Sequence, residues 1–375
     1  MFDVPRVPLG QGPTERGKVV AVHLLGTQTT PRGDVHGERI EVQIDGEVVT
    51  VERSRLESEA DYLPINAGDE VLLSATEGPN GVTYFIVDYV RDQGIWLLAL
   101  VFIAIVLLVA RGHGAWSLVG LVASFVVILR FIIPGILAGY NPPLIAFIGG
   151  SVIMATTLYL AHGVNTKTSV ALAGTALALL ITIVLGNLSI ELLRLSGFVT
   201  EEATTLHLLS EGGIDARGLL LAGIIIGALG VLDDVTVAQA ASVFEIRRAN
   251  FSLTAAELFA RGMNIGRDHI ASTVNTLFLA YSGASLPLLL ILSTQAESLA
   301  STMSQELVAT EIVRTLVGGI GITTAVPVTT ALAALFAHRL REPDEPAPVT
   351  TEPVVAAPVV ERRSLLDRRD EVSRK

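Results

Sequence analysis

The 375-residue chain contains no cysteine, which excludes disulfides, thiolate metal sites and thiol nucleophiles. Charged residues are also scarce, at 17%, whereas hydrophobic residues make up 50%. The mean hydropathy is positive, and several apolar runs approach the roughly twenty residues that a helix needs to cross a bilayer. These features exclude an ordinary soluble globule and predict a polytopic α-helical membrane protein.

Other absences narrow the function. The sequence has neither a nucleotide-binding loop nor an HExxH helix, so nothing indicates ATP-driven work or metalloprotease chemistry. Residues 1–93 hold sixteen Asp and Glu against eight Lys and Arg, a balance of −8, which argues against nucleic acid as a partner. His23 and His36 are isolated and predict no metal site. We expect no cofactor.

Residues 15–92 predict a small extracytoplasmic β barrel or sandwich of about five short strands. The segment 38–54 alternates apolar and polar residues on both sides of Asp45-Gly46, a strong hairpin signal. Further strands are expected at 17–25, 69–78 and 82–90, with a turn at Pro79, Asn80 and Gly81.

Residues 94–338 predict about seven transmembrane helices. The fifth is expected to begin near Arg217, and residues 191–213 before it suit a short surface helix with a loop. The other expected spans are 94–110, 115–133, about 143–162, about 168–187, from Ile270 to about 292, and about 312–337.

The distribution of Lys and Arg predicts the orientation. The loop between the fifth and sixth spans holds four arginines, which places it in the cytoplasm. The N-terminal domain then lies outside the plasma membrane and the C-terminus inside. Residues 1–14 lack an apolar signal region, so we suspect an upstream helix that would raise the count to eight with both ends inside. Residues 1–14 and 339–375 are predicted to be disordered.

Asp233 and Asp234 interrupt the fifth span, where each charge costs roughly 2.5–3.5 kcal/mol on insertion scales. Counting from Arg217, Asp233 lies about 24 Å into a core of about 30 Å. The sixth and seventh spans bring polar or helix-breaking residues to similar depths. This convergence predicts a transport site, as in transporters with broken helices, formed by Asp233, Asp234, Asn275, Thr276, Thr323, Thr324 and Pro327.

Structural interpretations remain open beside this one. The two acids could cap a helix that ends near Leu232, and Asn275 and Thr276 could hydrogen-bond between helices. Near the inner end of the sixth span, Arg267, Asp268 and His269 suit either an inner gate or a solvated interface. Glu311 and Arg314 are spaced as an i,i+3 ion pair.

Three stretches carry a family resemblance: GALGVLDDVTVAQAASVFEI (227–246), MNIGRDHIASTVNTLFLAYSGASLPLLLIL (263–292) and EIVRTLVGGIGITTAVPVTT (311–330). They resemble the YibE/F family of multipass membrane proteins. The resemblance implies a bacterial polytopic membrane protein with an extracytoplasmic β domain. The chain departs from the family pattern because it has two adjacent acids before Val235 where the pattern has one. We favour Asp234, which directly precedes Val235, as the functional acid.

The sequence therefore predicts a transporter or permease for an ion or small solute, driven by protonation of one of the acids. Expected partners are the lipid bilayer, the solute, and a second copy or another membrane protein. The alternative is a non-transporting sensor or assembly factor that acts through its β domain. An intramembrane hydrolase fits poorly, because adjacent acids point about 100° apart on a helix and cannot form a facing dyad.

Overall fold

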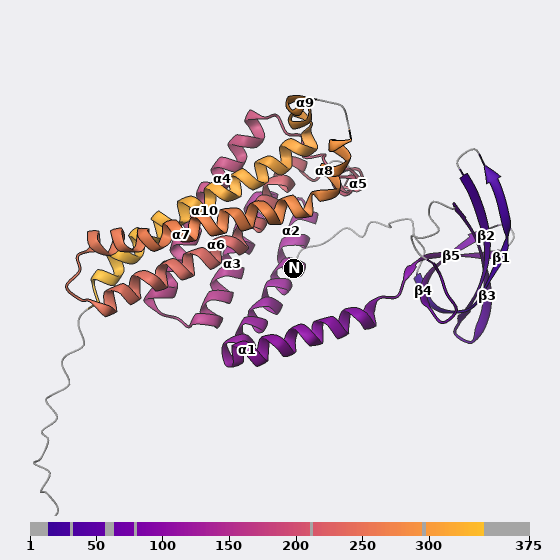
Figure 1. The fold of residues 1–375 in the computed structure, drawn as a ribbon, viewed down its shortest axis with the longest axis horizontal. Coiled ribbons are helices and arrows are strands. Elements are labelled where there is room, and N and C mark those ends of the chain that lie inside the picture. The colour runs from indigo at the N-terminus through magenta and orange to yellow at the C-terminus, as the bar shows by residue number, and fades with distance from the viewer. Residues whose placement is uncertain are drawn as a thin grey trace, which may run out of the picture.

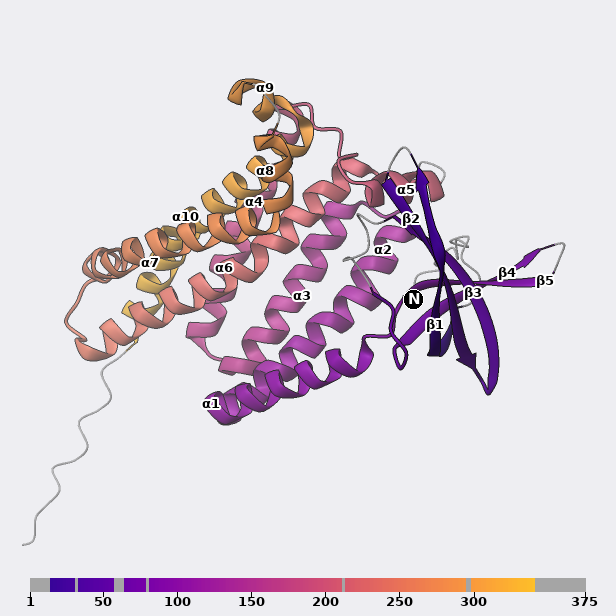
Figure 2. The same cartoon turned by 45° about the vertical axis from the view of Figure 1, so that its right-hand side comes forward.

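The computed structural model describes residues 14–30, 33–56, 64–78, 81–210, 213–294 and 298–340, and in these an antiparallel β sheet precedes a bundle of helices (Figures 1 and 2). Most of the two predicted disordered ends lies outside the described residues. So do Pro79 and Asn80 of the predicted turn.

The sheet has five strands in the order β3-β2-β1-β4-β5, and all neighbouring strands are antiparallel. Its core contains Ile40, Val71 and Leu73, none of which is exposed. Because β3 also contacts β5, the sheet curls toward a barrel. The strands are β1 (Thr14–Thr30), β2 (Gly33–Ile44), β3 (Glu47–Leu56), β4 (Glu70–Gly78) and β5 (Gly81–Tyr89).

The structure confirms the predicted hairpin at Asp45-Gly46. Ile44 pairs with Glu47, so the loop has two residues. Both have positive φ, 46° at Asp45 and 95° at Gly46. A two-residue type I′ turn requires this conformation, because its twist matches that of the flanking strands.

Five of the described helices are long and apolar enough to cross a membrane, or six if one bent pair forms a single span. The expected count of about seven is therefore not confirmed. The helices are α1 (Asp92–Val127), the π-helical η2 (Ile128–Ile132), α2 (Ile133–Leu137), α3 (Pro142–His162), α4 (Thr166–Leu192), α5 (Glu201–Leu209), α6 (Ala216–Ala249), α7 (Ala255–Ala284), α8 (Leu286–Ser293), α9 (Leu299–Ser304) and α10 (Glu306–His338).

The difference in count arises in Asp92–Leu137, which forms one candidate span of 46 residues. The sequence divides it into two spans, and the backbone breaks between them at Arg111, with φ 50° and ψ −130°. A straight helix of this length would extend about 69 Å, more than twice the thickness of a ~30 Å hydrocarbon core. Gly114 permits the corner, because a Cβ there would lie 2.7 Å from the Val106 carbonyl oxygen.

Helices α4, α6 and α10 form the centre of the bundle, with α3 against α6, and α7 against α10 and α6 (Figure 2). Small residues let these helices approach closely. The Thr175 and Thr236 hydroxyls are hydrogen-bonded at 2.5 Å across α4 and α6. A Cβ on Gly174 would meet the Thr329 hydroxyl of α10 at 2.2 Å.

Two sets of polar contacts hold the ends of the bundle, one around the partly buried Glu306 and one around the buried Arg247. At the start of α10, the Glu306 carboxylate accepts from the backbone N–H groups of Ser196 and Gly197 and from the Ser196 hydroxyl. At the opposite end, Arg247 of α6 donates to four backbone carbonyls, in the α6–α7 loop and at the end of α10. Each set of contacts therefore ties α10 to a loop beside α6.

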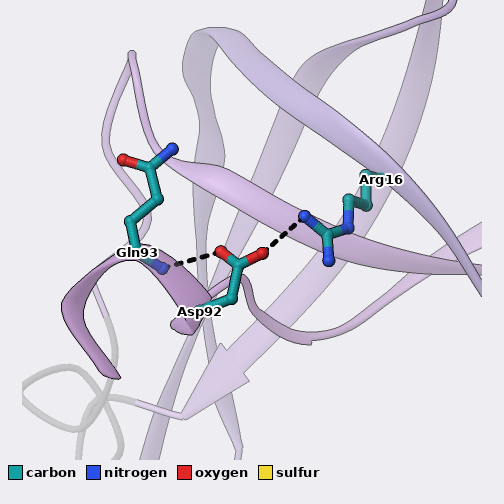
Figure 3. A network of polar contacts seen from close by, with 3 residues as sticks. All are labelled: Arg16, Asp92 and Gln93. Carbon is teal, nitrogen blue, oxygen red and sulfur yellow. Dashed lines mark hydrogen bonds and ion pairs between the residues drawn. The ribbon is translucent and has the colours of Figure 1, made fainter. Parts of the chain in front are cut away.

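The sheet joins the bundle through α1. Figure 3 shows the Asp92 carboxylate between the Arg16 guanidinium of β1, at 2.7 Å, and the Gln93 backbone N–H, at 2.8 Å. Only two residues separate the end of β5 at Tyr89 from the start of α1. The ion pair therefore fastens the sheet to the first turn of the helix.

The sixth predicted span differs most from the structure. Residues 270–292 do not form one helix, because α7 ends at Ala284 and α8 leaves it at an angle of 67°. Pro287 lies in the first turn of α8, where proline is tolerated, but it prevents α7 from continuing. Helix α7 also begins fifteen residues earlier than expected, at a capping box of Thr254 and Glu257.

Candidate functional site

The two acids lie inside a continuous helix. Helix α6 runs unbroken to Ala249, so the interpretation of Asp233 and Asp234 as caps near Leu232 is wrong. Asp233 is partly buried, and its Oδ1 is enclosed with no hydrogen-bond partner among the described residues. Asp234 is exposed. The structure therefore encloses Asp233, whereas the family resemblance favours Asp234.

The helical period places Asp233 on the α3 side of α6. Residues seven apart lie on one face of a helix, and Ile226 precedes Asp233 by seven. Ile226 packs against an apolar cluster that includes Ile145 of α3, and Leu229, four residues before Asp233, would lie 3.3 Å from a Cβ on Gly150 of α3. Asp233 therefore faces α3 and not, as its depth predicted, the sixth and seventh spans.

Asn275 and Thr276 lie on the outer surface of α7, where both are exposed. The Thr276 hydroxyl donates to the Ser272 carbonyl one turn earlier in the same helix, at 3.0 Å. The structure therefore shows no interhelical hydrogen bond from Thr276 within the described chain.

Arg267, Asp268 and His269 lie near the middle of α7, more than three turns after its start. The Arg267 guanidinium donates to the Asn264 side chain at 2.9 Å, and Asp268 is exposed. Nε2 of His269 is buried without a partner among the described residues. The predicted inner gate thus lies within a helix and not at a helix end.

Thr323 and Thr324 of α10 line a cavity of about 280 Å³ between α7 and α10. Val274 and Leu277 form its α7 wall. Both threonine hydroxyls donate to carbonyls of their own helix, at 2.8 and 2.9 Å. Pro327 lies one turn further along in the helical run of α10. The structure therefore brings the two threonines to α7 but not to Asp233.

A second cavity, of about 250 Å³, lies where α7, α8 and α10 meet. Its polar lining residues include Tyr281, Ser285 and Glu311. Glu311 forms the predicted ion pair with Arg314, at 2.7 Å, and this prediction is confirmed. The sequence did not predict this cavity, which depends on the bend after Ala284. The available signal was Pro287, because proline cannot continue a helix.

Gln239 of α6 was also missed. Its side-chain amide donates to the Gly262 carbonyl of α7 at 2.8 Å and to the Thr330 hydroxyl of α10 at 2.7 Å. It is almost fully buried, at 2% exposure. A lone glutamine five residues after Asp234 was the only signal, and buried polar side chains are usually hydrogen-bonded in this way.

Comparison with known proteins identifies the family. The family described as YibE/F-like protein matches residues 98–339. The chain belongs to the YibE/F-like family. The match begins within α1 and ends just after α10, so the YibE/F-like region contains every candidate site residue but not the β sheet. No curated protein and no solved structure matches the chain.

Proposed function

We propose that this YibE/F-like protein transports an ion or small solute across the plasma membrane, with Asp233 and Asp234 as its intramembrane polar site. In this proposal the β sheet lies outside and the C-terminal end of α10 faces the cytoplasm. The observation that carries the proposal is the enclosed Oδ1 of Asp233, which has no partner among the described residues.

A carboxylate in an apolar helix is costly, and such residues in membrane proteins usually serve a solute or proton pathway. The unpartnered oxygen of Asp233 is available to accept a proton or to bind a passing cation. Asp234 adds a second charge on the next residue, on the exposed side of the helix. The pair therefore combines one enclosed and one accessible carboxylate at the same depth.

Helix α7 supplies further support. Its exposed side carries polar residues every three or four positions over eighteen residues, which corresponds to about 27 Å. Lipid tails cannot form hydrogen bonds with these polar side chains, so we infer that water or another polypeptide covers this face of α7. The residues are Glu257, Arg261, Asn264, Asp268, Ser272 and Asn275.

The decisive experiment is solute flux into proteoliposomes, measured against a panel of ions and small solutes. We expect Asp233→Asn to abolish flux without loss of membrane insertion, and Asp234→Asn to reduce it. Asp215→Asn is the matched control, because Asp215 caps the same helix outside the apolar segment and Asn also caps well. Equal accumulation by wild type and Asp233→Asn vesicles would contradict the proposal.

The exposed apolar side chains of β5 favour a second candidate, a sensor or assembly factor. Phe85 and Val87 are 51% and 45% exposed on an edge strand of the sheet, a surface to which another chain could bind. This candidate predicts that deletion of residues 15–92 abolishes function in cells but leaves any vesicle flux intact. Loss of flux on deletion would count against it.

A further inference from the structure

The two cavities between α7 and α10 are neighbouring chambers of one seam. Phe278, Thr315 and Leu316 line both of them. The outer chamber lies at the start of α10, beside the bend between α7 and α8, and the deeper chamber extends to Thr324. Beyond Thr324 the seam closes, because Gly266 of α7 packs directly against Val326.

Both chambers have a mostly apolar lining, and the polar side chains of the seam differ between them. The outer chamber is lined by the side chains of Tyr281, Ser282, Ser285 and Glu311, together with leucines of α8. In the deeper chamber the hydroxyls of Thr323 and Thr324 are already bonded to their own helix, and most other lining atoms are apolar. A ligand that fits both chambers is therefore largely apolar, with a polar group only where Glu311 lines the outer chamber.

The seam opens sideways onto exposed apolar side chains of the bundle surface. Phe278, Leu289 and Leu316 border it and are 57%, 43% and 59% exposed. From Glu311 to Thr323 is twelve residues of α10, or roughly 18 Å. One leaflet of a bilayer contributes about half of a ~30 Å hydrocarbon core. An acyl chain of ordinary length therefore extends from the polar end of the seam to its closed end.

The charges at the polar end favour one class of head group. Glu311 lines the outer chamber, and its carboxylate is joined at 2.7 Å to the guanidinium of Arg314, which lies just outside the chamber lining; the two side chains remain 24% and 31% exposed. A neutral pair of this kind presents an acceptor for an ammonium beside a donor for a phosphate. A zwitterionic head group matches both charges, whereas an anionic head group meets the repulsion of Glu311.

We propose that the seam between α7, α8 and α10 binds a zwitterionic phospholipid with a primary ammonium group. Its head group contacts Glu311 and Arg314, and one acyl chain fills the outer chamber and extends past Phe278 to Thr324. This site is separate from Asp233, which faces α3, and its occupancy requires no flux.

The test is photolabelling of the full-length protein in vesicles. Phosphatidylethanolamine with a diazirine on its acyl chain is compared with phosphatidylglycerol carrying the same chain. We expect label on α7 and α10 at residues that line the chambers, about tenfold stronger with phosphatidylethanolamine, the effect of one charge-assisted hydrogen bond. Equal labelling by the two lipids overturns the proposed head-group contact.

Two variants locate the lipid. Gly319→Leu fills the deeper chamber, and a Cβ at Gly319 meets no described atom within 4 Å, so the helix tolerates the change. We expect severalfold less label there at an unchanged melting temperature. Glu311→Gln removes the preference between lipids. Gly283→Leu, on an exposed part of α7 that lines neither chamber, is the matched control and keeps full labelling.

Unchanged labelling in Gly319→Leu, or a cross-link from the seam to a second protein chain in place of lipid, overturns the proposal. Because labelling is measured without a gradient, its failure leaves the role of Asp233 intact. Loss of flux in Asp233→Asn together with full labelling supports both proposals separately.

Discussion

The two halves of the α7–α10 seam pack very differently. In the inner half, Gly262 and Gly266 bring α7 so close that a Cβ on Gly266 would lie 2.4 Å from Val326. In the outer half, large residues such as Phe278 and Leu316 hold the same two helices apart around two cavities. The same helix pair is therefore tightly closed at one end and open at the other.

The difference shows what holds a helix pair together in lipid. Apolar side chains gain little from leaving lipid for protein, so close contact depends on small residues and hydrogen bonds. The inner half has both, in its glycines and in the amide of Gln239. The outer half has small residues too, such as Gly319, but among the described residues no hydrogen bond joins α7 to α10 across its cavities, which leaves room for lipid.

The largest effect is expected for Gly266→Leu. The new side chain has no space beside Val326 and Gln239, so α7 must move away from α10. We expect a loss of about 3 kcal/mol in the free energy of unfolding, the upper range for overpacked cores, measured by denaturant titration in detergent. Gly283→Leu is the control, since a Cβ there meets nothing within 4 Å in the described chain. Equal stability of the two variants would contradict the tight inner contact.

A smaller effect is expected for Gln239→Leu. The variant loses both hydrogen bonds, but the Thr330 hydroxyl keeps its bond to the Val326 carbonyl, so no partner hydroxyl is left unpaired. We expect a loss of about 1 kcal/mol, measured in the same titration. Asn275→Leu makes the same change from amide to leucine at an exposed position. If it destabilises the protein as much, the buried amide does not hold the inner half.

The smallest effect is expected for Gly319→Ala in the open half. The added methyl enters the cavity, and alanine favours the helix over glycine by about 0.5–1 kcal/mol. We expect unchanged or slightly raised stability in thermal unfolding. The same substitution at Gly266 should destabilise the protein, and a destabilised Gly319→Ala would show that the outer half is not open.

Local sequence signals predicted the β sheet and most helices well. The hairpin at Asp45-Gly46 was predictable because its turn requires positive φ at both residues. The i,i+3 pair of Glu311 and Arg314 needs only helical spacing. The helix boundaries were less accurate around α7, since hydropathy predicts where a chain is apolar and not where a polar amphipathic helix begins.

The candidate site was harder to predict. Counting residues gives the depth of a side chain along its helix, but it does not give the direction in which that side chain points from the helix axis. Asp233 and Asn275 have similar depths in a simple count, but Asp233 faces α3 and Asn275 lies exposed on α7. Gln239 carries no motif, and only the approach of three helices gives it partners. Rotation about each helix axis depends on tertiary packing, which spacing in one sequence does not determine.

The connection between the sheet and the bundle has a mechanical consequence. The sheet is fastened by Arg16 and Asp92 to the first leg of α1, and within α1 only Gly114 and Gly120, both beyond the corner at Arg111, are buried. That leg is therefore a lever whose fulcrum is the backbone at Arg111. We therefore expect a rotation of the sheet to change the angle between the two legs of α1 at this one residue.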